Sequence, residues 1–158
     1  MKNNFIQRAI TGAIFIAVLI GGIVSGPIPF TILFSLISAL TIYEFGTIIG
    51  KSGEVQINKS ITILAGIFLF IGFGYLGVAP GKNEILIPYL FLIIYLFVSE
   101  LYLKKKNPVH NWAYAMMSQI YIALPFALLN VLAYHTSSDG SISEYNPILP
   151  LSIFIFKS

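Results

Sequence analysis

The side chains that could do chemistry in this sequence are few, and the most unusual is Glu44, a carboxylate inside an apolar run. It lies about five residues before the end of that run, roughly 8 Å from the end of a helix that rises 1.5 Å per residue. A carboxylate at that depth in a membrane must be paired or hydrated. Glu44 either lines a polar cavity or forms a buried pair with Arg8 of the adjacent helix, and we favour the pair. If Glu44 lines a cavity instead, Arg8 and Glu44 are the candidates for substrate contacts.

Two other groups of charged residues have structural interpretations. The segment Gly46-Thr-Ile-Ile-Gly50-Lys51-Ser52 looks like a phosphate-binding loop, but three residues separate its glycines where the motif needs four, and no strand precedes it. It predicts instead the C-terminus of a helix with a basic flank. Glu100 precedes Lys104 by four residues, a spacing that predicts an ion pair on one face of a helix.

No metal site, cofactor site or catalytic residue is predicted within the sequence. It contains no cysteine and two histidines, His110 and His135, which the expected topology places on opposite sides of a membrane. The loop after His135 predicts a solvated turn, since no second carboxylate lies at ligand spacing from Asp139. Gln119 and Asn130 lie inside an apolar run, where interhelical hydrogen bonds are the expected role.

The elements that must position these residues are membrane-spanning helices. Of the 158 residues, 57% are hydrophobic and 9% are charged, whereas a soluble domain has about 25% charged residues. Lipid offers the backbone no hydrogen bonds, so long apolar runs cross it as helices. A crossing requires roughly 20 residues. The sequence therefore predicts an all-α, polytopic integral membrane bundle of about five helices, at residues 9–25, 28–49, 60–79, 85–103 and 112–134.

Charge placement predicts which ends of the helices face the cytoplasm. With a cytoplasmic N-terminus, Lys82 alone lies in a short outer loop, and the other basic residues before the last run lie inside, as the positive-inside rule requires. These inner residues are Lys2, Arg8, Lys51, Lys59, Lys104, Lys105 and Lys106. The distribution predicts a multi-pass protein with its N-terminus in the cytoplasm, and it relates to topology rather than to nucleic-acid binding.

The first two runs are separated only by Ser25-Gly26-Pro27, which predicts a tight reversal and a helical hairpin. A cleavable signal peptide is the competing interpretation, but Pro27 stands where cleavage would be expected. Pro125 lies within the fifth run and predicts a kink. Small residues recur at every fourth position of the first run, which allows a neighbouring backbone to approach closely; they are Ala9, Ala13, Ala17, Gly21 and Ser25.

The last apolar run, residues 147–156, is about half as long as a crossing requires. We expect it to be the beginning of a sixth span that is truncated in this sequence. The alternative is an interfacial anchor from which Lys157 reaches toward water.

Five short segments carry a resemblance to a known family. They are Phe5-Ile-Gln-Arg8-Ala-Ile-Thr11-Gly12, Tyr43-Glu44-Phe45, Asn107-Pro-Val-His-Asn-Trp112, Leu124-Pro125-Phe126 and Leu149-Pro150-Leu151. In this order and spacing they resemble the N-terminal half of bacterial phosphatidate cytidylyltransferase, also called CDP-diglyceride synthase, and its Bacteroidetes branch in particular. The resemblance covers nearly the whole chain but only about half of the family's length.

The resemblance implies an enzyme of the bacterial inner membrane that condenses CTP with phosphatidate, giving CDP-diacylglycerol and diphosphate for phospholipid synthesis. It implies Mg²⁺ for the full-length enzyme, and CTP and the membrane lipid phosphatidate as partners. It leaves a homo-oligomer open.

The family's signature of Ser, Lys and paired Asp residues belongs to its C-terminal half, and this sequence contains none of it. We therefore expect a fragment that is inactive alone. The alternative is a complete, non-enzymatic small membrane protein, such as a scaffold, a lipid-binding subunit or a transporter fragment, which would have no nucleotide chemistry.

Overall fold

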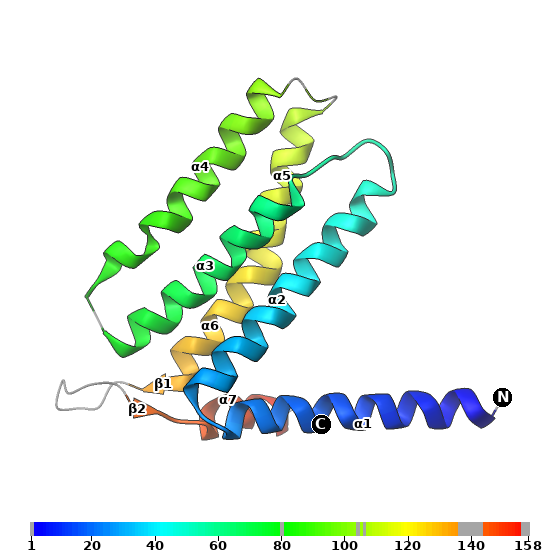
Figure 1. Cartoon of the computed structure of the whole chain (residues 1–158), viewed down its shortest axis with the longest axis vertical. Helices are drawn as coiled ribbons and strands as arrows, with labels where there is room; N and C mark the ends of the chain where they lie inside the picture. Colours follow the sequence, from blue (N-terminus) through cyan, green and yellow to red (C-terminus); the bar gives the residue numbers. More distant parts are fainter. Residues whose placement is uncertain (1, 80, 104, 106, 136–143, 156–158) are drawn as a thin grey trace.

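The chain folds as a bundle of long helices, with one further helix lying across an end of the bundle (Figure 1). The computed structural model describes residues 2–79, 81–103, 105, 107–135 and 144–155. In this part of the chain, five helical segments are long and apolar enough to cross a membrane: Ile6–Val24, Pro27–Gly50, Lys59–Val78, Asn83–Tyr102 and Pro108–Ala133. The predicted all-α membrane bundle is confirmed.

The helices follow one another with short connections. The first three are α1 (Lys2–Val24), α2 (Pro27–Gly50) and α3 (Lys59–Val78). The fourth span begins with the 3₁₀ turn η1 (Asn83–Leu86) and continues as α4 (Ile87–Tyr102). The fifth consists of α5 (Pro108–Ser118), the π-helical turn η2 (Gln119–Ala123) and α6 (Leu124–Ala133). The two-residue strands β1 (Tyr134–His135) and β2 (Glu144–Tyr145) pair antiparallel, and α7 (Ile148–Ile155) follows.

Prolines explain the boundaries and the irregularity of the fifth span. The span begins at Pro108, four residues earlier than predicted, because proline at the first helical position fits the helix and loses no hydrogen bond there. Pro125 has no N–H to donate to the carbonyl of Tyr121. A π turn ends at Ala123, two residues before Pro125, and such turns are a recognised cause of helix kinks. The fifth span is therefore irregular near Pro125, while the kink itself stays a prediction.

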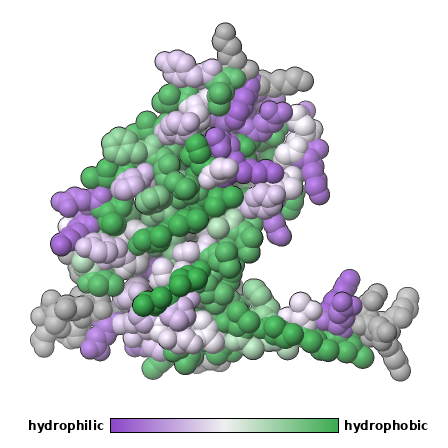
Figure 2. Space-filling model, in the orientation of Figure 1, coloured by the Kyte–Doolittle hydropathy of each residue, from purple (hydrophilic) through white to green (hydrophobic). Residues whose placement is uncertain are grey.

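The central helix of the bundle is α3, which packs against α2, α4 and α6. At one end α2 and α4 finish while α3 and α5 begin; this end carries Lys51, Lys59 and Lys105 and is called the basic end below. The opposite end carries Lys82 and the β1–β2 ladder. A hydrophobic band separates the hydrophilic residues of the two ends (Figure 2). Charge placement predicted this separation.

An aromatic cluster holds the opposite end together. Phe30 and Phe34 of α2, which face α3 and α6, are buried, and their ring centroids lie 4.8 Å apart. The Phe30 centroid is 6.3 Å from that of Phe70 on α3 and 5.7 Å from that of Tyr145. The Tyr145 hydroxyl donates a hydrogen bond of 2.6 Å to the carbonyl of Ile23. Burial of large side chains therefore joins α1, α2, α3 and β2 here.

The predicted hairpin of the first two helices is wrong. Gly26 has φ of 115°, a left-handed conformation that favours glycine, and the chain turns there so that α1 runs across the end of the bundle instead of back along α2 (Figure 1). Only the last turns of α1 pack on the bundle, where Ile23 is buried and Gly22 lies against Leu33. The small-residue face of α1, from Ala9 to Ser25, is exposed.

The run expected to start a sixth span forms α7, a helix of eight residues. It packs against α6 and α1, with Pro150 buried and Leu151 against the aromatic cluster. Lys157 and Asp139, which also carried sequence interpretations, lie outside the described residues.

Candidate functional site

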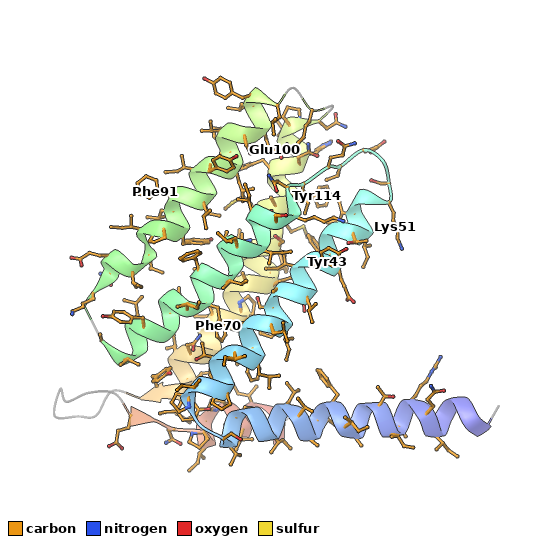
Figure 3. The ribbon with its side chains drawn as sticks, in the orientation of Figure 1. Tyr43, Lys51, Phe70, Phe91, Glu100 and Tyr114 are labelled. Carbon is orange, nitrogen blue, oxygen red and sulfur yellow. The ribbon has the colours of Figure 1, made fainter. Side chains whose placement is uncertain are left out.

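A buried carboxylate lies at the basic end, where α4 turns into α5. The side chain of Glu100 is 3% exposed. The Lys105 ammonium forms an ion pair with Glu100 Oε1 at 2.6 Å, and Asn111 Nδ2 donates a hydrogen bond of 2.9 Å to Glu100 Oε2. Both carboxylate oxygens therefore have a partner, as a charge removed from water requires. Figure 3 shows Glu100 near the top of the bundle.

The same residues bind the backbone of the loop between α2 and α3. Lys105 Nζ donates a hydrogen bond of 2.9 Å to the carbonyl of Gln56, and the Gln56 N–H donates one of 2.7 Å to Asn111 Oδ1. Asn107 Nδ2 donates to the carbonyl of Glu54 at 3.2 Å. Glu100, Lys105, Asn111 and the backbone of Gln56 are called the Glu100 cluster below. It fixes the α2–α3 loop against the corner between α4 and α5.

The ion pair predicted between Glu100 and Lys104 stays a prediction, but the structure shows another partner for Glu100. The described partner of Glu100 is Lys105, five residues along the chain, while Lys104 lies outside the described residues. α4 ends at Tyr102, so Lys105 reaches Glu100 from beyond the end of the helix. Glu100 is also buried in a network, whereas the prediction placed its pair at the surface.

The sequence candidates Arg8 and Glu44 do not meet. Both side chains are exposed, and among the described residues no ion pair joins them. Glu44 lies toward the basic end of α2, whereas Arg8 lies on the part of α1 that runs away from the bundle (Figure 1). The predicted buried pair is therefore wrong, and the turn at Gly26 is the physical reason. Whether Glu44 contacts a substrate stays a prediction.

A second group at the basic end surrounds Lys59, at the start of α3. Its ammonium donates a hydrogen bond of 3.0 Å to the Thr47 hydroxyl and lies 5.2 Å from the centroid of the Tyr43 ring. Both contacts hold Lys59 against α2, and the two contacted residues stand on either side of Glu44 in the sequence. The segment from Gly46 to Ser52 ends α2 at Gly50, so the prediction of a helix C-terminus is confirmed.

A hollow of about 270 Å³ lies beside the Glu100 cluster, between the end of α2, the α2–α3 loop and the start of α5. Its polar lining includes Ser52, Glu54, His110 and Tyr114. Figure 3 shows Tyr114 and Lys51 at this end of the molecule. The basic end thus combines hydrogen-bonding side chains, an aromatic ring and several cations near the expected membrane surface.

Gln119 and Asn130 form interhelical hydrogen bonds deeper in the bundle, as predicted. Gln119 Nε2 donates to the carbonyl of Thr62 at 2.8 Å, and Asn130 Nδ2 donates to the carbonyl of Phe70 at 3.1 Å. Both side chains are buried and join the fifth span to α3. These contacts stabilise the scaffold and offer no reactive group.

Comparison with known proteins decides the family. A family model described as the cytidylyltransferase family matches residues 6–143, which is most of the chain. The chain belongs to the cytidylyltransferase family. The resemblance seen in the sequence is thereby confirmed at the level of the family. No curated protein and no solved structure matches.

For a cytidylyltransferase, the expected Mg²⁺ needs several oxygen ligands. The part of the chain that the structure describes contains no group of three or more His, Cys, Asp or Glu residues that could hold a metal ion. Glu100 is already engaged by Lys105 and Asn111. The whole sequence contains one aspartate, Asp139. The described residues therefore contain no cluster of three such ligands for Mg²⁺.

The sequence indicated only part of this candidate site. It indicated a charged cluster near Glu100 but missed Asn111 and the backbone of Gln56, which lies 55 residues before Asn111. One signal was present, because Glu100 and Asn111 stand on either side of the three lysines at a turn between two spans. The role of Gln56 could not be predicted, because it binds through its backbone and every residue type except proline has the same backbone groups.

Proposed function

We propose that this member of the cytidylyltransferase family belongs to phosphatidate cytidylyltransferase and transfers a cytidylyl group from CTP to phosphatidate. The observation that carries the proposal is the family match across residues 6–143, in a chain with five helices apolar enough to cross a membrane. A lipid acceptor suits such a chain, because a phosphate fixed to two acyl chains is confined to the membrane surface. The basic end, with its lysines and polar groups, is the end that suits this phosphate and CTP.

The reaction exchanges one phosphoanhydride bond for another. An oxygen of the phosphatidate phosphate attacks the α-phosphorus of CTP, the bond between the α-phosphorus and the bridging oxygen breaks, and diphosphate leaves. Four negatively charged phosphate groups meet in this step, so cations must stabilise the developing charge. Lysines supply part of that charge, and Mg²⁺ supplies the rest in the family.

The Glu100 cluster has a positioning role in this proposal. It holds the α2–α3 loop, with Lys51 before it and Lys59 after it, in one place at the basic end. A lysine ammonium has three N–H donors, and Lys105 uses two of them on Glu100 and Gln56. We place the basic end in the bacterial cytoplasm, where CTP is found, which agrees with the positive-inside rule.

We also propose that these 158 residues do not perform the transfer alone. It is supported by the single aspartate of the sequence and by the lack of a metal-binding group among the described residues. The remaining catalytic groups must then come from a polypeptide equivalent to the family's C-terminal half.

The test measures CDP-diacylglycerol formed from radiolabelled CTP in membranes that contain phosphatidate and Mg²⁺. We expect the chain alone to match membranes without it, and product to appear when the C-terminal half of a phosphatidate cytidylyltransferase is expressed with it. Product from the chain alone would disprove the dependence on other catalytic groups. No product with both halves present in the membrane, while a full-length enzyme is active there, would disprove the function.

The second candidate function is non-enzymatic lipid binding, which the single aspartate of the sequence favours. It predicts no product in either arm of the assay, together with lipid binding that does not respond to CTP. The two candidates therefore differ in one measurement.

A further inference from the structure

The outward side of α2 carries a charge among exposed apolar side chains. Glu44 is exposed, and so are five large apolar residues that continue the same four-residue spacing: Ile28, Ile32, Leu36, Leu40 and Ile48. These six residues are called the α2 ridge below. The buried residues of α2 lie two positions away, from Phe30 to Gly46. Two positions turn a helix by about 200°, so the ridge lies on the side opposite to the packed one.

The carboxylate of Glu44 belongs to a residue that lies below the membrane surface. The 24 residues of α2 extend about 36 Å at 1.5 Å per residue, roughly 6 Å more than a hydrocarbon core of about 30 Å. When this excess is shared between the two ends of α2, Glu44, which stands six residues before Gly50, lies about 6 Å inside the core. A carboxylate at this depth has to be paired or hydrated.

Within the described part of the chain, Glu44 has no ionic partner. The five candidate spans contain two basic residues, Arg8 and Lys59. Lys59 is engaged by the Thr47 hydroxyl and the Tyr43 ring. Arg8 lies on the part of α1 that runs away from the bundle (Figure 1). We therefore expect the partner of Glu44 to come from another molecule.

The α2 ridge also indicates the kind of molecule that supplies this partner. Its apolar side chains extend over about 30 Å of helix, a length that suits the apolar face of another membrane-spanning helix. A lipid headgroup keeps its charge above the hydrocarbon core, whereas a lysine or arginine of a helix can lie at the depth of Glu44. A second copy of this chain fits less well, because two facing ridges would bring two Glu44 carboxylates together.

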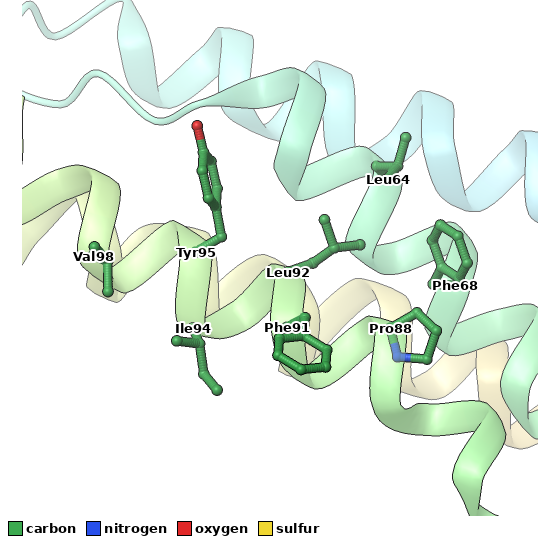
Figure 4. A pocket seen from close by; sticks show the side chains of 8 residues that line it. All are labelled: Leu64, Phe68, Pro88, Phe91, Leu92, Ile94, Tyr95 and Val98. Carbon is green, nitrogen blue, oxygen red and sulfur yellow. The ribbon is translucent and has the colours of Figure 1, made fainter.

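Charge distinguishes the α2 ridge from the groove between α3 and α4 (Figure 4). Among the described residues that line the groove, such as Leu64 of α3 and Leu92 of α4, there is no charged side chain. Lipid chains satisfy an apolar surface of this kind, and nothing in the groove selects a partner. On the α2 ridge, by contrast, lipid chains leave a carboxylate without a hydrogen-bond donor.

We propose that the α2 ridge binds a membrane-spanning helix of another polypeptide, and that a lysine or arginine of this helix pairs with Glu44. The inference goes beyond the proposed function, because binding of a helix needs neither CTP nor a transferred group. A chain that fails the transfer assay is therefore still a fair test of the ridge.

The test measures how tightly the whole chain binds synthetic membrane helices in phosphatidylcholine vesicles. The sequence has no cysteine, so Ser52→Cys provides a single thiol at the basic end for a donor dye. Leucine–alanine helices with an acceptor dye at one end differ only in one residue about 6 Å inside the core, which is lysine, leucine or glutamate. We expect energy transfer to give a dissociation constant about fivefold lower for the lysine helix than for the leucine helix, the ratio for roughly 1 kcal/mol between membrane helices. The glutamate helix should bind most weakly.

Two pairs of variants provide matched controls. Glu44→Leu should remove the preference for lysine, whereas Glu84→Leu, at an exposed carboxylate of the opposite end, should preserve it. Leu40→Trp adds a larger ring to the ridge and should weaken binding of the lysine helix, whereas Ile94→Trp makes a similar change on the exposed surface of α4 and should not. Equal binding of the lysine and leucine helices to the Ser52→Cys chain would overturn the proposal. A preference that persists in a folded Glu44→Leu protein would overturn the role of Glu44, and unchanged binding to Leu40→Trp would overturn the location.

Discussion

The two ends of the bundle are held together by different forces. At the basic end, an ion pair and hydrogen bonds join Glu100, Lys105 and Asn111 to the backbone of Gln56. At the opposite end, packed rings around Phe30 join α2, α3 and β2. The same helices therefore change from polar to aromatic contacts along their length.

This difference separates the scaffold from the region suited to chemistry. Aromatic packing fixes helix positions but presents no group that binds a phosphate. The polar contacts of the basic end fix a loop and also leave cations and hydrogen-bonding groups near the membrane surface. Losing the aromatic contacts should thus unfold the bundle, whereas losing the polar contacts should release the loop first.

The largest effect is expected for Phe30→Ala. Phe30 is fully buried, so the change leaves a cavity between Phe34 and Phe70 and lowers the free energy of unfolding by about 4 kcal/mol. Thermal unfolding in detergent micelles measures this loss. The matched control is Phe91→Ala, because the Phe91 ring is 67% exposed and should cost little. If Phe30→Ala increased hydrogen exchange at the Gln56 amide at temperatures where the bundle stays folded, the two ends would not be separate.

The next largest effect is expected for Glu100→Ala, which removes the buried carboxylate of the basic end. Lys105 and Asn111 lose their buried partner, and the free energy of unfolding should fall by about 3 kcal/mol. Hydrogen exchange at the Gln56 amide should accelerate before the bundle unfolds. The fluorescence of the one tryptophan, Trp112, reports on the same region, because it follows Asn111 directly. Glu84→Ala, at an exposed carboxylate of the opposite end, is the control and should change neither signal.

The smallest effect is expected for Tyr145→Phe, which tests the one hydrogen bond described above for the opposite end. The variant keeps the ring but removes the hydrogen bond to the Ile23 carbonyl, and should lose about 1 kcal/mol. Hydrogen exchange in the last turn of α1 would locate the change. Unchanged stability would mean that ring packing alone holds β2 at this end.

Alkaline pH should act at the same hydroxyl. Burial, with a smaller contribution from Tyr134, raises the pKa of Tyr145 from 10.0 to about 12. The folded state holds this proton more tightly than the unfolded state, so the stabilisation is complete below pH 10 and is lost as pH rises toward 12. Unfolding measured across this interval should show the loss in the unaltered chain and a smaller one in Tyr145→Phe. Identical pH profiles would contradict the assignment to Tyr145.

The fold was largely predictable because apolar length requires no knowledge of packing. The spans of α2, α3 and α4 follow from the length of their runs, and the start of α5 at Pro108 could have been read from a proline at a helix start. The path of α1 could not, because it depends on the conformation of a single glycine, Gly26. The sequence indicates that a sharp turn occurs there but not its direction.

The candidate site was less predictable than the fold. Glu100 was visible as a charge at a helix end, but its burial depends on a loop that is distant in sequence. The preferred pairing of Glu44 with Arg8 assumed a hairpin that does not form, and so failed with it. Hydrogen bonds to backbone atoms, such as those to Gln56, come from the folded path of the chain and not from residue types.

The most direct test of the account is whether the two ends lie on opposite sides of a membrane. The chain has no cysteine, so Ser52→Cys at the basic end and Lys82→Cys at the opposite end each introduce a single thiol. An impermeant maleimide is added to spheroplasts before or after permeabilisation. We predict that the Lys82→Cys protein is labelled in intact spheroplasts and the Ser52→Cys protein only after permeabilisation. Labelling of both proteins in intact spheroplasts would contradict a bundle that crosses the membrane with its basic end in the cytoplasm.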